Sequence, residues 1–164
     1  MKAIMLVENQ SVGECKAAHG LSLYIETPDH RLLFDLGPDR TFLENAGKLG
    51  VGLEKVDTVI ISHGHYDHGG GLEEFLKLNS KARVYIQKNA FEPHYSTAQG
   101  KARNIGLKPE LASHPRSYCW KETFRLTGSW NFLLLQVRKI AIPRPMTYSG
   151  TREDETASAM SRIF

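Results

Sequence analysis

A short run of the sequence, residues 62–71, concentrates side chains that bind metal ions. Three histidines and one aspartate lie within six positions, and three glycines follow them at once. Imidazole nitrogens bind Zn, Fe, Ni or Cu, and a carboxylate also admits Mn. The glycines allow close approach of other backbone segments and positive φ angles. The four candidate ligands are His63, His65, Asp67 and His68.

The spacing of these residues predicts that they converge on a pair of metals. On an extended backbone, side chains at i and i+2 point the same way, so His63, His65 and Asp67 share one side. The following turn can bring His68 round. Two histidines on one cation and Asp67 with His68 on another would hold a pair roughly 3.5–4 Å apart, which can deliver hydroxide to a phosphoryl or acyl centre. Surface histidines in a glycine-rich loop are the alternative, which a single HxH pattern would favour but the full pattern does not.

The elements around this run predict a βαβ unit. Residues 56–62 are rich in β-branched side chains, which is typical of a buried strand. Residues 71–78 have helical spacing of apolar side chains, and 82–87 form a further strand. The candidate ligands then lie at the carboxyl end of a strand, where α/β sheets place their sites.

The rest of the chain predicts further strands and one more helix. We expect a helix over about 40–49, capped by Asp39, and an irregular segment over about 93–115. The remaining predicted strands cover 2–8, the hairpin 21–26 and 31–35, then 118–126 and 129–142.

Composition limits the classes of protein to which this chain can belong. Its 164 residues carry a formal charge of +3 with scattered Lys and Arg, which argues against nucleic-acid binding. Cys15 and Cys119 form no CxxC pair, as expected of reduced thiols in a cytoplasmic protein. No apolar stretch approaches the roughly 18 residues of a membrane span, so we expect no membrane partner.

The motif and its flanks together resemble a known family. HxHxDH after a β-strand is the signature of the metallo-β-lactamase fold superfamily. Residues 18–26, 33–37, 43–46 and 61–72 also resemble, in order and spacing, the dihydropterin ribofuranosyl-aminobenzene phosphate synthase branch, which is linked to methanopterin synthesis. The resemblance covers roughly the first 95 residues and implies an α/β (α+β sandwich) fold with αββα layers.

The resemblance implies roles for individual residues. His63 and His65 would bind the first metal and Asp67 and His68 the second, with Asp67 also catalytic. Asp35, in the FDTG-like element, would orient the metal loop from beneath. His19 would contact substrate, with a structural role as the alternative, and the Glu8-Asn9 pair would lie near the end of the first strand. Two histidines lie in the irregular segment, for which exposure to solvent is favoured and a position facing the pocket is the alternative: His94 and His114.

The resemblance also implies that only the N-terminal half of the family's fold is present. The family's later ligands include two further histidines, but no histidine follows His114 here. We therefore expect an incomplete domain over 1–142 and a poorly anchored tail over 143–164. Truncation, a second chain that supplies the other half, or a homodimer are the alternatives.

Two functional hypotheses follow. The first is a cytoplasmic metal-dependent hydrolase with two divalent transition metals, most often Zn but also Mn or Fe. It would direct a metal-bound hydroxide at a small phosphorylated, ester-like or pterin-like molecule. The second is a catalytically inactive remnant or partner subunit that retains half of the metal site, since each catalytic zinc typically takes three protein ligands and water.

Overall fold

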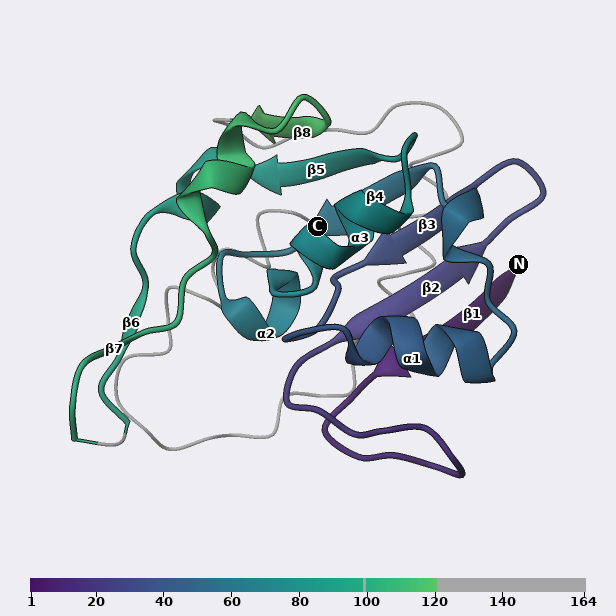
Figure 1. The fold of residues 1–164 in the computed structure, drawn as a ribbon, viewed down its shortest axis with the longest axis horizontal. Coiled ribbons are helices and arrows are strands. Elements are labelled where there is room, and N and C mark those ends of the chain that lie inside the picture. Colours follow the sequence, from purple (N-terminus) through teal and green to yellow (C-terminus); the bar gives the residue numbers. More distant parts are fainter. Residues whose placement is uncertain (99, 121–164) are drawn as a thin grey trace. The chain divides into compact units, whose positions relative to one another are not determined.

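The computed structural model describes residues 1–98 and 100–120, and these form a mixed α/β structure built on one large sheet (Figure 1). The sheet has six strands in the order β1-β2-β3-β4-β5-β8. The strands are β1 Lys2–Val7, β2 Ser22–Glu26, β3 Arg31–Phe34, β4 Thr58–Ile61, β5 Arg83–Gln87 and β8 Ser117–Trp120.

The sheet is antiparallel at one side and parallel at the other. β1, β2 and β3 form an antiparallel meander, so the predicted hairpin of β2 and β3 is confirmed. β3, β4, β5 and β8 run parallel to one another. Parallel neighbours need crossover connections, and these are α1 (Thr41–Lys48) between β3 and β4 and α3 (Leu72–Leu78) between β4 and β5. The βαβ unit that the sequence predicts is therefore present.

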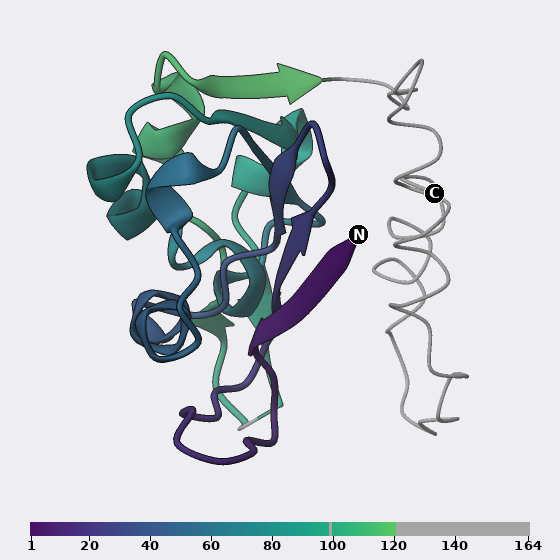
Figure 2. The ribbon, with the colours of Figure 1, turned by 90° about the vertical axis from the view of Figure 1, so that its right-hand side faces the viewer.

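Helices α1 and α3 pack on the same face of the sheet, as the edge-on view shows (Figure 2). Alternate side chains of β1 to β5 point toward this face and form one apolar core with both helices. Tyr24, Leu33, Val59 and Val84 stand side by side in this core because the strand register aligns them.

The opposite face of the sheet is also apolar over its central strands. On β2, β3 and β4, the apolar side chains that alternate with the helix-facing core are no more than 5% exposed. A sheet with two apolar faces is typical of an inner layer of a layered α/β fold rather than of an outer sheet with one solvated face. These residues are Leu23, Ile25, Leu32, Phe34 and Ile60.

One buried amide connects α1 to the long loop between β1 and β2. Asn45 is 1% exposed and its Nδ2 donates to the carbonyl oxygens of Leu6 (2.7 Å) and Lys16 (2.8 Å). Its Oδ1 accepts the backbone N–H of Lys16 at 2.9 Å. All the hydrogen-bonding capacity that this buried side chain needs is thus met by backbone of β1 and the loop.

Some details differ from the sequence-based expectations. Asp39 lies one residue before the helix cap, and it accepts the backbone N–H of Thr41 at 2.8 Å, so it supports the start of α1 without being its cap. The segment predicted as irregular contains two short paired strands, β6 (Tyr95–Ser96) and β7 (Arg103–Asn104), and a 3-10 turn over Pro109–Ser113.

The strand expected over 118–126 is present as β8 for residues 117–120, and its later part lies outside the described residues. The strand expected over 129–142 and the tail over 143–164 lie outside them too, as does the boundary between the two.

Candidate metal centre

The metal-binding motif lies at the carboxyl end of β4, where it turns into the one-turn helix α2 (Tyr66–Gly69). Its backbone is tied to the segment that follows β3: the N–H of Leu36 donates to the carbonyl of His68 (2.7 Å), and the N–H of Gly71 donates to the carbonyl of Gly37 (3.2 Å). The loop is therefore held against the ends of two neighbouring parallel strands, as expected from its position in the sequence.

Close approach, and not positive φ, explains the glycines that follow the motif. Among the described residues, the glycines with positive φ are at other positions. A Cβ built on Gly70 would lie 2.1 Å from the carbonyl oxygen of Pro38, and one on Gly71 would lie 2.6 Å from that of Leu36. Side chains here would push the loop away from the strand ends. The expectation of positive φ at these glycines is wrong, and that of close packing is confirmed.

Asp35 lies beneath the loop and is fully buried. Its carboxylate accepts the N–H of Ser62 (2.8 Å), the hydroxyl of Ser62 (2.8 Å) and Nδ1 of His68 (2.7 Å). A carboxylate that receives three hydrogen bonds is well satisfied despite its burial. These are the contacts that the predicted orienting role of Asp35 requires.

The same network fixes the tautomers of two histidines. The single hydroxyl proton of Ser62 goes to Asp35, so the 2.9 Å contact of Ser62 Oγ with His63 Nδ1 has the imidazole as donor. Nδ1 of His63 and Nδ1 of His68 therefore both carry hydrogens. The Nε2 atoms remain as the ligand atoms, which is how carboxylates commonly prepare metal-binding histidines.

Three of the four predicted ligands converge. Ligand atoms of His63, Asp67 and His68 all lie within 4.8 Å of one another. The ring centroids of His63 and His68 are 4.2 Å apart, and that of His65 is 4.5 Å from His63. Two imidazoles and a carboxylate suit a divalent transition metal, so this donor set fits the expected ion. The predicted assignment of His63 with His65 and of Asp67 with His68 stays a prediction.

The environment shifts the pKa values of the three motif histidines. Burial, reinforced by the neighbouring histidines, lowers the pKa of His63 to about 3. Burial also lowers the pKa of His65, against the opposing charge of Asp67. Burial acts in the same direction on His68, but the hydrogen bond and charge of Asp35 outweigh it and raise its pKa. His63 and His65 are thus neutral at neutral pH, as metal ligands must be.

His19 comes close to the centre from the loop between β1 and β2. Its Nε2 lies 3.4 Å from Oδ2 of Asp67, and its Nδ1 lies 3.1 Å from Oδ1 of Asn9. The side chain of His19 is 75% exposed, so it stands at the open edge of the cluster. This position is compatible with the predicted substrate contact, and Asn9 is the residue that holds the ring in place.

Gly20 explains how the loop with His19 packs so closely. Its φ is +125°, and a Cβ built there would lie 1.9 Å from the carbonyl oxygen of Asp67. The next N–H, of Leu21, donates to that same oxygen at 3.3 Å. Only glycine permits this backbone conformation and this approach together.

The two histidines of the segment after β5 have different positions. The His94 ring centroid is 5.3 Å from that of His65, so His94 lies beside the cluster rather than apart from it. The sequence favours a solvent-exposed His94 over one that faces the pocket, because an irregular segment gives no periodicity from which to orient a side chain. His114 Nδ1 instead accepts the backbone N–H of Arg116 at 3.3 Å, in a turn before β8.

Comparison with known proteins identifies relatives. An uncharacterized protein of Methanocaldococcus jannaschii is 34% identical over 113 residues, which are 67% of this chain and 42% of that protein. The 7,8-dihydropterin-6-methyl-4-(β-D-ribofuranosyl)-aminobenzene-5'-phosphate synthase of the same organism is 33% identical over 85 residues, 48% of this chain and 29% of that protein. The chain thus spans less than half the length of these relatives.

A solved structure has a similar fold. Tm1679, described as a metal-dependent hydrolase of the β-lactamase superfamily, matches with a TM-score of 0.58 and 30% sequence identity, over 77% of this chain and 44% of that one. Within the described part of the chain, no helix has the length and apolar character needed to cross a membrane.

The sequence profile of the metallo-β-lactamase superfamily matches residues 16–151. With the mixed α/β sheet and the histidine-rich strand end, this match shows that the chain belongs to the metallo-β-lactamase superfamily.

Proposed function

We propose that this protein is a metal-dependent hydrolase, or the part of one that holds its first metal ligands. The convergence of His63, Asp67 and His68 at the end of β4 is the observation that carries the proposal. Their side chains are largely buried, and Asp35 and Ser62 orient both imidazoles from below. Histidines with a purely structural role do not require this arrangement, in which hydrogen bonds at Nδ1 fix the rings and keep Nε2 available as the ligand atom.

The metal ions and the surrounding side chains have different roles in the proposed reaction. A bound pair of divalent cations, which we propose to be Zn with Mn or Fe as alternatives, supplies Lewis acidity and an activated water for attack on a phosphoryl or acyl centre. Asp35 keeps a proton on Nδ1 of His68, and the low pKa of His63 keeps its Nε2 free of a proton. Asp67 lies between the metal side of the cluster and His19, whose exposed ring faces the solvent from which a substrate enters.

The proposed substrate is a small phosphorylated or ester-like molecule, including a pterin-like one. The relative named as a dihydropterin-linked phosphate synthase supports this class, as does the chemistry of the superfamily match. We propose a cytoplasmic location from the two unpaired cysteines, which are both free thiols.

A second candidate is a catalytically inactive partner subunit. The observation that favours it is the ligand count: among the described residues there is one convergent group of three ligands, which is enough for a single zinc but not for two metals. A second metal would need ligands beyond this group, and a second copy of this chain or another chain could supply them.

Metal analysis and turnover distinguish these candidates. We expect purified protein to bind at least one equivalent of transition metal, and His63→Ala to lose it, while His114→Ala serves as the matched control. Less than one equivalent, or no loss in His63→Ala, contradicts metal binding at this centre. Hydrolysis of bis(p-nitrophenyl) phosphate that Asp67→Ala abolishes supports the hydrolase; metal binding without turnover supports the partner subunit.

A further inference from the structure

The ring of His94 lies beside that of His65, although His94 comes 26 positions after His68 in the sequence. Its ring stands edge-on to that of His65, with 5.3 Å between the centroids and 85° between the planes. His94 therefore faces the same space as the motif histidines.

The hydrogen bonding of His94 is that of a metal ligand. Nδ1 lies 2.6 Å from the carbonyl oxygen of Glu92, which can only accept, so Nδ1 carries the hydrogen. Nε2 is then the unprotonated nitrogen of the neutral ring. Metal-binding histidines commonly donate their other N–H to a backbone carbonyl, which fixes both the tautomer and the ring orientation.

Backbone contacts hold His94 against the metal loop. The N–H of Ile105 donates to the carbonyl of His94 (2.8 Å), and the N–H of Tyr66 donates to the carbonyl of Ile105 (2.8 Å). The segment that carries His94 is thus joined to the loop between two of the predicted ligands. A Cβ on Gly64 would lie 2.7 Å from Cε1 of His94, so Gly64 leaves the space that the ring occupies.

The ring separations are compatible with shared coordination. With metal–nitrogen distances of about 2.0 Å, two imidazoles on one tetrahedral ion have centroids about 5 Å apart. The centroid of His65 lies 4.5 Å from that of His63 and 5.3 Å from that of His94. Since the convergent group is made of His63, Asp67 and His68, the imidazoles of His65 and His94 are left beside it as a pair.

We propose that His94 is an additional metal ligand, which binds through Nε2 the ion that His65 binds. The inference rests on the proposed metal centre and deepens it. It brings the ligands of the described residues to five, which lets this part of the chain hold a second ion with two imidazoles of its own. The segment after β5 then supplies one ligand, at a distance in sequence from the HxHxDH run.

Cobalt spectroscopy of a cysteine variant tests the assignment directly. In His94→Cys loaded with Co(II), a thiolate ligand adds a sulfur-to-cobalt charge-transfer band in the near ultraviolet that the wild type lacks. His114→Cys is the matched control and should show no band. His94→Ala should bind the second equivalent of Co(II) about tenfold or more weakly than wild type, with an unchanged far-ultraviolet circular dichroism spectrum.

The outcomes separate this inference from the proposed function. Absence of the band in His94→Cys, with unchanged Co(II) affinity in His94→Ala, overturns the assignment of His94 while wild-type metal binding stands. Failure of the wild type to bind Co(II) overturns the metal centre itself. A band in His94→Cys without hydrolysis by the wild type supports the ligand and contradicts the hydrolase.

Discussion

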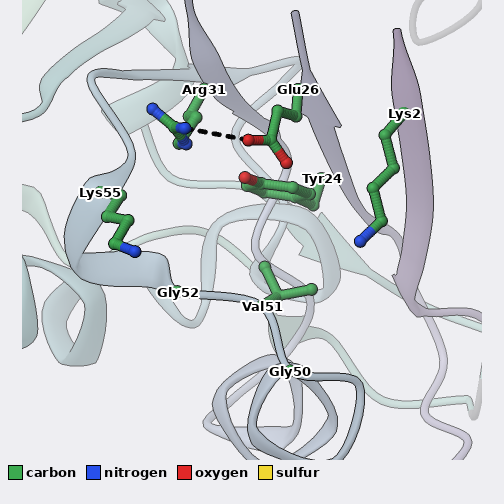
Figure 3. A pocket seen from close by; sticks show the side chains of 8 residues that line it. All are labelled: Lys2, Tyr24, Glu26, Arg31, Gly50, Val51, Gly52 and Lys55. Carbon is green, nitrogen blue, oxygen red and sulfur yellow. Dashed lines mark ion pairs between the residues drawn. The ribbon is translucent and has the colours of Figure 1, made fainter.

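Polar and charged side chains gather at both ends of β3, and the two groups behave differently. At its carboxyl end lie Asp35 and the metal loop. At its start, Arg31 lines a small cavity of about 120 Å³ together with side chains of β1 and β2 and of the segment after α1 (Figure 3). The lining residues are Lys2, Tyr24, Glu26, Arg31, Gly50, Val51, Gly52 and Lys55.

The group at the start of β3 is a row of exposed charges. The strand register places Lys2 opposite Glu26, and Glu26 opposite Arg31. Arg31 pairs with Glu26 at 3.0 Å, and both side chains are about one third exposed. Alternating charges across neighbouring strands satisfy one another, so this cavity needs no ligand to explain its composition.

The group at the carboxyl end has no such balance. Asp35 is fully buried, and the imidazoles above it are held by hydrogen bonds at their Nδ1 atoms. Burial lowers the pKa of His63 to about 3, because the charged imidazole would lose its hydration at this position. The contrast shows that burial and fixed tautomers, rather than the presence of charge, distinguish a candidate site from an ordinary strand end.

The largest expected effect is at Asp35. Asp35→Ala removes a buried acceptor to which the N–H and hydroxyl of Ser62 and Nδ1 of His68 donate. We expect a loss of about 3–5 kcal/mol in the free energy of unfolding, measured by urea denaturation of the metal-free protein. Glu26→Ala, at the other end of the sheet, is the control. Equal losses in the two variants would remove the contrast between the ends.

Gly20→Ala tests whether the loop with His19 is held by close packing. The new Cβ would lie 1.9 Å from the carbonyl oxygen of Asp67, at a φ of +125°. We expect a destabilisation of about 1–3 kcal/mol and weaker metal binding, because Asp67 must move. Gly13→Ala is the matched control, since its φ of +67° is also positive but its Cβ meets nothing within 4 Å. A larger loss in Gly13→Ala would contradict the packing explanation.

The stability of the metal-free protein should depend on pH through His63. The pKa of His63 is about 3 in the folded protein and 6.5 in the unfolded chain, so between these pH values the unfolded chain binds a proton that the folded protein excludes. The contribution of His63 to the free energy of unfolding is fully present above pH 6.5. It is lost as the pH falls below this value, by on the order of 1 kcal/mol per pH unit.

His63→Gln should remove that dependence on acid, as seen in urea denaturation at several pH values. The raised pKa of His68 acts in the opposite direction: its contribution is present below pH 6.5 and is lost as the pH rises through the folded value. An identical pH profile in wild type and His63→Gln would show that His63 is not buried in this way.

The smallest effect is expected at the exposed charge row. Arg31→Gln removes the ion pair with Glu26, which is worth less than about 1 kcal/mol at this exposure. Metal content should not change, because β3 separates this residue from the metal loop. A loss of metal in Arg31→Gln would show that the two ends of the strand are coupled.

Much of the fold could be predicted from local sequence patterns. The β-branched run corresponds to β4, and the helical spacing of apolar residues corresponds to α3. Both patterns depend only on which faces of an element are buried, and this can be seen in the order of apolar and polar residues. The position of Asp35 beneath the loop followed only from the family resemblance. Its hydrogen bonds to Ser62 and His68 join residues 27 and 33 positions away, and no local pattern encodes such pairs.

His94 marks the limit of prediction at the site. The strands β6 and β7 that follow it are two residues each, too short for any periodicity. What places His94 beside His65 is a pair of backbone hydrogen bonds through Ile105, and backbone groups are the same in every sequence. A histidine that is fixed by main-chain contacts therefore looks, in the sequence, like any exposed histidine.

The buried amide of Asn45 has a consequence for the order of folding. The loop between β1 and β2 finds its partner in a helix 29 residues further along the chain, so its path is undefined until α1 has docked on the sheet. Closure of so distant a contact comes at a higher entropic cost than formation of the β2–β3 hairpin. His19 should therefore reach Asp67 late in folding, and this corner should be the first to exchange its amide hydrogens when the native protein opens locally.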